Sequence, residues 1–131
     1  MKKKMTLLLA IILLLGNLCS VSAETVDSGT FYGLQYTTTG YGITAYCAFG
    51  DGLTYPLNAP ITVTTSKSGC VVYAVSTAYN EAGSGIGGNS GGGNNSINIS
   101  YVPSTSAYMV KNVHSDATNN LQKSYTLARY R

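Results

Sequence analysis

Residues 47–70 decide the fold, and they read CAFGDGLTYPLNAPITVTTSKSGC. A strand pattern leads into the first cysteine, because apolar residues occupy every second position of 43–49. Residues 61–65 alternate in the same way, and residues 70–79 are apolar on both faces, as in a central strand. The glycines and aspartate at 50–52 indicate a tight turn. The pattern predicts a β domain that is closed across this stretch by a disulfide.

The first 23 residues have the pattern of a secretory signal peptide. Three lysines precede a short apolar run, and small residues lead up to Ala23. We therefore predict cleavage between Ala23 and Glu24 and a secreted or extracellular protein, free or associated with the cell surface. The apolar run is short for a membrane span. The residues before Cys19 match a lipidation signal poorly, although a lipoprotein remains an alternative.

Removal of this leader changes both the charge and the cysteine count. The whole chain carries eight Lys and Arg against five Asp and Glu, but three of the lysines lie in the leader. The mature chain 24–131 therefore has no net charge, which removes the electrostatic argument for nucleic acid as a partner. Cys47 and Cys70 remain as an even pair in an oxidising compartment, so we predict that they form a disulfide. A loop of this length contributes about 3 kcal/mol to stability.

The mature chain is predicted to be one all-β domain. Its eleven tyrosines and many threonines suit a half-buried pleated surface, and no ten-residue stretch has helical periodicity. The spacing of turns predicts a small antiparallel β-sandwich, or a small barrel, of about seven short strands. Residues 24–28 are expected to be a flexible start. Residues 82–96 are rich in Gly, Ser and Asn and are expected to be a flexible loop.

No catalytic, cofactor-binding or metal site is expected. Residues 83–88 match GxGxxG by letter, but no helix pattern and no acidic residue about 20 positions later accompany them. His114 is the only histidine, and we expect it to pair with a neighbouring acid such as Asp116 at the surface. A hydrolase that uses His114 is an alternative, although no serine lies in a GxSxG elbow. Two cysteines and one histidine are too few for a zinc site, and Asp51 alone is a weak calcium ligand.

The tyrosines are the most suggestive candidates for a contact surface. Tyr32, Tyr36 and Tyr41 are the candidate contact residues, because tyrosine combines rigid apolar area with a hydroxyl group. Alternatively, the tyrosines fill the core in place of the scarce Leu and Phe.

The overall composition of the chain, exported and rich in Gly, Asn and Tyr, is similar to that of small secreted bacteriocin-like proteins of Gram-positive bacteria. This resemblance covers composition and no matched functional residue; it implies antimicrobial activity. Our first expectation is a small secreted, non-catalytic binding or cell-surface interaction protein. Its candidate partners are cell-wall glycan, a membrane surface or another protein, and not nucleic acid. A bacteriocin-like antimicrobial protein and a hydrolase are the alternatives.

Overall fold

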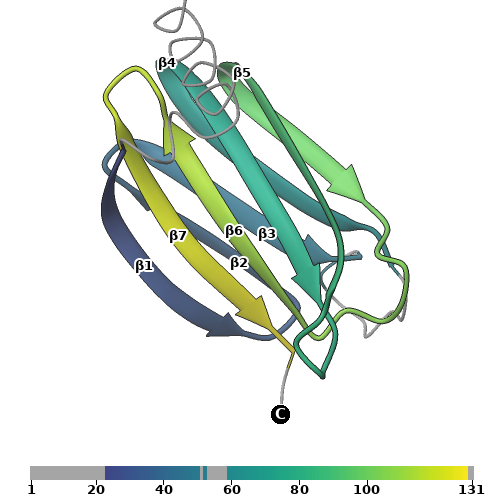
Figure 1. Cartoon of the computed structure of the whole chain (residues 1–131). Helices are drawn as coiled ribbons and strands as arrows, with labels where there is room; N and C mark the ends of the chain where they lie inside the picture. The colour runs from purple at the N-terminus through teal and green to yellow at the C-terminus, as the bar shows by residue number, and fades with distance from the viewer. Residues whose placement is uncertain (1–22, 51, 53–58, 130–131) are drawn as a thin grey trace, which may run out of the picture.

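The strands of this protein follow the alternation of apolar and polar residues in its sequence. The computed structural model describes residues 23–50, 52 and 59–129, and in these ranges the chain is all-β, with no helix (Figure 1). The strands are β1 (Glu24–Tyr32), β2 (Gln35–Gly40), β3 (Ile43–Phe49), β4 (Ile61–Tyr79), β5 (Gly85–Tyr101), β6 (Met109–Asp116) and β7 (Leu121–Ala128). The predicted all-β class is confirmed. The expected shortness of the strands is wrong for β4 and β5, which have 19 and 17 residues.

One hydrogen-bonded sheet contains all seven strands, in the order β1-β7-β6-β4-β3-β2, with β5 paired to β4. The first part of β4 pairs with β3 and the last part with β6, while β5 follows β4 along its other edge. A bulge between Ser66 and Val71, with Gly69 at a φ of 77°, bends β4, and Asn95 at a φ of 68° bends β5. Because both strands bend at the same level, the hairpin of β4 and β5 bends as a unit and curves the sheet.

The two ends of the strand order, β1 and β2, approach each other and leave the sheet nearly barrel-shaped (Figure 1). The ring of Phe31 in β1 stacks on that of Tyr36 in β2, with 4.8 Å between centroids. In the short link between the two strands, the Gly33 N–H donates to the Ala128 carbonyl (2.8 Å) and the Leu34 carbonyl accepts from Phe49 (2.9 Å). The ring stacking joins the two ends of the strand order, and the two backbone hydrogen bonds fix the link between them to the ends of β7 and β3.

The core lies inside the curled sheet and has the composition that the alternation predicts. The alternating apolar positions of β3 all face inward. The apolar side chains with no exposed surface are Ile43, Ala45, Cys47, Ala48, Ile61, Val63, Val72, Ala74, Ala78, Val110 and Leu127. Each large apolar side chain that becomes buried stabilises the fold by about 1.5–3 kcal/mol.

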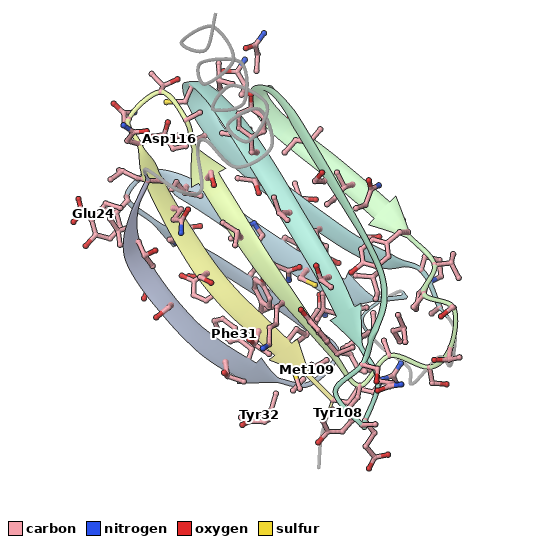
Figure 2. All side chains as sticks on the ribbon, viewed as in Figure 1. Glu24, Phe31, Tyr32, Tyr108, Met109 and Asp116 are labelled. Carbon is pink, nitrogen blue, oxygen red and sulfur yellow. The ribbon has the colours of Figure 1, made fainter. Side chains whose placement is uncertain are left out.

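The start of the domain differs from the prediction, because residues 24–28 form a strand rather than a flexible segment. β1 pairs with β7 in parallel, so the sheet is not wholly antiparallel. The Glu24 N–H donates to the Asn120 carbonyl (2.8 Å), and the Tyr125 hydroxyl donates to Asp27 (2.6 Å). Figure 2 shows the two residues at the end of β1, Phe31 and Tyr32, on opposite sides of the strand. The predicted leader lies outside the described residues except for Ala23, and its cleavage stays a prediction.

The predicted flexible loop at 82–96 is wrong, because most of it belongs to β5. β4 supplies a continuous ladder of partners for this stretch, from Val71 opposite Asn94 to Ala78 opposite Gly87. Two of its glycines lie where backbones approach closely: a Cβ on Gly88 would lie 2.6 Å from the carbonyl oxygen of Ser76, and a Cβ on Gly93 would lie 2.6 Å from that of Ser96. At these positions glycine allows close packing of one backbone on another within the structure.

The predicted Cys47–Cys70 disulfide is also wrong, because both cysteines are free in the structure. The ladder between β3 and β4 places Val63 opposite Cys47. Cys70 lies seven positions further along β4, which is about 20 Å of strand. A disulfide requires Cα atoms within about 7 Å of each other. The two strands do pair, but their register keeps the cysteines apart.

Candidate functional site

The three tyrosines that were expected to form a contact surface do not lie together. Tyr32 is 51% exposed and Tyr41 is 61% exposed, but they flank opposite ends of β2. Tyr36 lies between them and is buried, so its prediction as a surface contact is wrong. The reason is register: Tyr36 stands opposite Cys47 in the ladder of β2 and β3, and both side chains point into the core.

The only histidine lies in the core rather than at the surface. Both ring nitrogens of His114 bind hydroxyl groups at 2.8 Å: Nε2 meets the Tyr36 hydroxyl and Nδ1 meets Thr65 Oγ1. The Asn112 amide donates to the same Tyr36 hydroxyl (2.9 Å), so Tyr36 links Asn112 to His114 within the core. Burial, together with the positive charge of Lys123, lowers the pKa of His114 to about 3. The ring is therefore neutral and fully bonded within the core.

The expected pairing of His114 with Asp116 is wrong, although both side chains point inward from β6. Asp116 is fully buried and accepts from Lys67 Nζ (2.6 Å) and from Asn119 N and Nδ2 (3.0 and 2.8 Å). Burial alone would raise the pKa of Asp116, but the donors from Lys67 and Asn119 outweigh it and hold the pKa at about 2. His114 and Asp116 thus serve separate contacts, and no atom of the His114 side chain reaches the surface.

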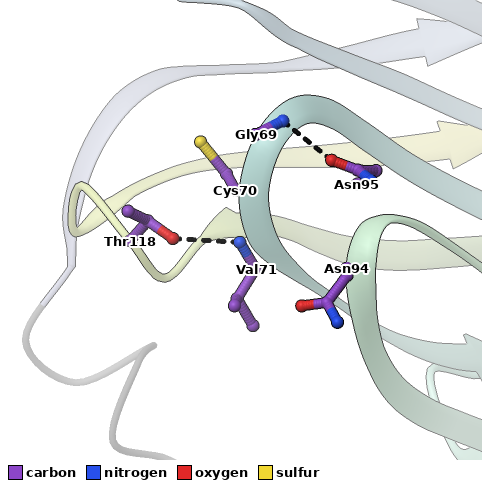
Figure 3. Close-up of a pocket in the computed structure, with 6 residues that line it drawn as sticks. All are labelled: Gly69, Cys70, Val71, Asn94, Asn95 and Thr118. Atoms are coloured by element: carbon purple, nitrogen blue, oxygen red, sulfur yellow. Dashed lines mark hydrogen bonds between the residues drawn. The ribbon is translucent and has the colours of Figure 1, made fainter.

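A pocket of about 280 Å³ opens at the bend of β4 and β5 (Figure 3). Two residues with positive φ shape it: the Gly69 N–H donates to Asn95 Oδ1 (2.7 Å), which ties one bend to the other. The Val71 N–H donates to Thr118 Oγ1 (2.9 Å) and connects the bend to the turn between β6 and β7. The pocket is lined by Gly69, Cys70, Val71, Asn94, Asn95 and Thr118, and none of them is charged.

An exposed apolar strip on β4 extends from this pocket. Val71 and Tyr73 are 38% and 37% exposed, whereas Val72 and Ala74 are buried. The predicted burial of both faces of this strand is therefore wrong. Tyr73 pairs with Gly92, and its ring covers that glycine so closely that a Cβ there would lie 2.5 Å from a ring carbon. The ring is thereby held in place on the outer face of the sheet.

We refer to the pocket residues together with Tyr73 as the bend surface. The sequence patterns do not predict that Tyr73 and Asn94 form a surface. Tyr73 lies in a stretch that is predicted to be buried on both faces, and Asn94 lies in the predicted flexible loop. The glycines of residues 85–93 were the one feature of the sequence that could have indicated this exposed surface. A strand without side chains cannot cover the outer face of its neighbour, so it leaves an aromatic residue on that neighbour exposed.

No group of three or more His, Cys, Asp or Glu side chains in the described part of the chain is arranged to hold a metal ion. Within the same ranges, no helix has the length and apolar character needed to cross a bilayer. Asp51, considered above as a calcium ligand, lies outside the described residues. No protein-family model matches this sequence, and no curated protein matches it.

The two free thiols are expected to react very differently. Burial raises the pKa of Cys47 to about 12, and its side chain has no exposed surface, whereas Cys70 lines the open pocket. In the native protein we expect one thiol to react promptly with an aromatic disulfide reagent, and the second only after unfolding. The measurement is a thiol titration with and without denaturant.

The matched control for this titration is Cys70→Ser, which should remove the prompt reaction and leave the slow one. If the denatured but unreduced protein showed no reactive thiol, the original prediction of a Cys47–Cys70 disulfide would be correct after all. Two prompt thiols would instead contradict the burial of Cys47.

Proposed function

We propose that this protein is a small secreted, non-catalytic binding module that recognises neutral carbohydrate of the cell surface through the bend surface. The observation that carries the proposal is the Tyr73 ring, which is held over Gly92 beside a pocket without charged residues. The C–H face of a sugar packs on an aromatic ring, and sugar hydroxyls bind amide and hydroxyl groups. Tyr73 is exposed and offers the first kind of contact. Asn94 lines the pocket and offers the second (Figure 3).

The size and rigidity of the bend surface support the same ligand class. A volume of about 280 Å³ lies at the small end of ligand pockets and suits one sugar unit rather than a large ligand. Hydrogen bonds fix the pocket wall at Gly69, Val71 and Asn95, so little conformational entropy is lost on binding. The absence of charge among its lining residues favours a neutral ligand over a phosphate or an acidic polymer.

β1 begins where the predicted signal-peptide cleavage site lies. β1 begins at Glu24 itself, and the Glu24 N–H already bonds to the Asn120 carbonyl. Cleavage after Ala23 would therefore leave all seven strands of the sheet whole.

Replacement of Tyr73 by Ala is expected to weaken carbohydrate binding by about tenfold or more, because it removes the stacking platform. Asn94→Ala should weaken binding by a few fold through the loss of an amide partner. The measurement is titration calorimetry with soluble N-acetylglucosamine oligosaccharides, together with sedimentation of the protein with purified Gram-positive cell walls.

Tyr32→Ala is the matched control, because Tyr32 is a more exposed tyrosine that lies opposite Ala128, at the other end of β7 from the turn that holds Thr118. It should bind like the wild type. Equal losses in Tyr73→Ala and Tyr32→Ala would contradict the assignment of the surface. If the wild type bound neither the oligosaccharides nor the walls but inhibited bacterial growth, the antimicrobial alternative would replace this proposal.

A further inference from the structure

The pocket of the bend surface has two polar side chains whose oxygen atoms already accept hydrogen bonds from the backbone. Asn95 Oδ1 accepts from the Gly69 N–H at 2.7 Å, and Thr118 Oγ1 accepts from the Val71 N–H at 2.9 Å (Figure 3). Because a backbone N–H can only donate, both side-chain oxygens must be the acceptors in these bonds. The orientation of the Asn95 amide is thereby fixed, with its oxygen and not its nitrogen on Gly69.

The capacity that these two side chains keep for a ligand is therefore mainly that of a donor. Asn95 Nδ2 carries two N–H groups, and the Thr118 hydroxyl carries one O–H. Neither group donates to a partner among the described residues, and both side chains are exposed. A ligand with a strong acceptor, such as the carbonyl of an amide, would satisfy these donors.

An apolar side chain lies in the same pocket. Val71 is 38% exposed, and Figure 3 shows it between Thr118 and Asn94. Val71 and Tyr73 lie on the same face of β4 and about 7 Å apart, because they are two residues apart on one strand. A small apolar group that is attached to a ring stacked on Tyr73 can therefore reach Val71.

An anion is the other kind of ligand that donors attract, but this pocket does not suit one. No lysine or arginine is among the described residues that line it. Asn119 donates to Cys70 Sγ at the pocket wall (3.5 Å) and also to the Asp116 carboxylate (2.8 Å), so a carboxylate lies behind the wall. An anionic ligand would lose its hydration without gaining a cation. The pocket therefore favours an uncharged acceptor.

We propose that the pocket recognises the acetamido group of an N-acetylated sugar, whose carbonyl accepts from Asn95 Nδ2 and whose methyl group packs on Val71. This group combines an uncharged acceptor with a small apolar end, and the pocket offers a donor and an apolar side chain. The inference rests on the proposed function, because it places the sugar ring itself on Tyr73. It makes Asn95 and Val71 the residues that determine specificity among neutral sugars.

The test compares two β-1,4-linked trimers, one of N-acetylglucosamine and one of glucose, which differ only in the acetamido or hydroxyl group at C2. Titration calorimetry is carried out on the protein isolated from culture medium. The wild type should bind the N-acetylated trimer about tenfold or more tightly than the glucose trimer, because only the former offers the carbonyl and the methyl group.

The two ways in which the wild type can fail this test are distinguishable. Equal affinity for the two trimers overturns the recognition of the acetamido group and leaves the proposed carbohydrate binding in place. Binding of neither trimer overturns the inference as well, and the proposed function falls with it if the protein does not sediment with cell walls either.

Asn95→Asp tests the donor alone. Aspartate tolerates the φ of 68° at this position and keeps an oxygen for the Gly69 N–H, but an ionised carboxylate has no proton to donate. The preference for the N-acetylated trimer should therefore fall by about tenfold. Asn98→Asp is the matched control, because it makes the same change at an exposed position of β5 that does not line the pocket. It should keep the preference of the wild type.

Val71→Thr tests the apolar contact, because it replaces one methyl group by a hydroxyl of similar size on an exposed strand position. It should reduce the preference by a few fold. Circular dichroism establishes that each variant is folded before its preference is compared. A folded Asn95→Asp variant with the full preference of the wild type overturns the role of Asn95, and the comparison of the two trimers on the wild type decides the inference whether or not the variants fold.

Discussion

Lowering the pH from 7 to 5 is expected to reduce the free energy of unfolding by about 2 kcal/mol, because the core holds a neutral histidine. The pKa of His114 falls from an ordinary 6.5 to about 3 in the folded state, first through burial and then through the nearby charge of Lys123. At a pH between these two pKa values, His114 takes up a proton in the unfolded chain but not in the folded chain. The contribution of the neutral His114 to stability is therefore fully present above pH 6.5, and it is lost as the pH falls towards 3.

The geometry around His114 explains why the folded state resists protonation. Both ring nitrogens are already bonded to neutral hydroxyl groups in the core, Nε2 to Tyr36 and Nδ1 to Thr65. Burial raises the pKa of Tyr36, which keeps this phenol protonated. A proton added to the ring would create a charge that is removed from water and lies near the ammonium group of Lys123.

Thermal unfolding at several pH values is the measurement, and a fall in midpoint of about 10 °C is expected between pH 7 and 5. Because His114 is the only histidine, His114→Gln is a suitable control. This variant will have a lower midpoint at pH 7, but its stability should depend little on pH between 7 and 5. A wild type with a flat profile in this range, or a variant with the same slope, would contradict the neutral burial of His114.

Replacement of Lys67 by Met is expected to cost about 3 kcal/mol at pH 7, because it leaves the buried Asp116 carboxylate without its cation. Lys67 Nζ lies 2.6 Å from Asp116 Oδ2, and the Asp116 side chain has no exposed surface. Asn119 alone would remain as a donor to the carboxylate. Chemical denaturation of the variant and the wild type measures the difference.

The pH dependence of this loss distinguishes an unpaired charge from lost packing. In the wild type the pKa of Asp116 is lowered to about 2, so its ionised form contributes stability above pH 3.8 that disappears as the pH falls to 2. Without Lys67, burial should raise this pKa, so the folded variant takes up a proton more readily than the unfolded chain. The loss caused by Lys67→Met should therefore shrink as the pH is lowered from 7 to 4.

Lys111→Met is the matched control for Lys67→Met. Lys111 is exposed and lies over the Tyr79 ring at 5.2 Å, so its removal should cost less than about 1 kcal/mol. Equal losses in the two variants, or a loss at Lys67 that does not change with pH, would contradict the role given to Asp116.

The sequence alone determined the class of this fold and the inner face of its central strands. The alternation of apolar residues at 43–49 and 61–65 is a local property, since successive side chains of a strand point to opposite faces whatever its partner is. The buried faces of β3 and the first part of β4 follow directly from it.

Only the tertiary structure decided which strands meet and in which register. Register placed Val63 rather than Cys70 opposite Cys47, and turned Tyr36 and His114 into the core. It also gave the glycine-rich segment a continuous partner in β4, so a stretch with the composition of a flexible linker became a strand. The bend surface arose in the same way, because the exposure of Tyr73 depends on the glycine that stands beside it. Partner and register are set by the packing of residues that are distant in the chain, and for that reason no local pattern contains them.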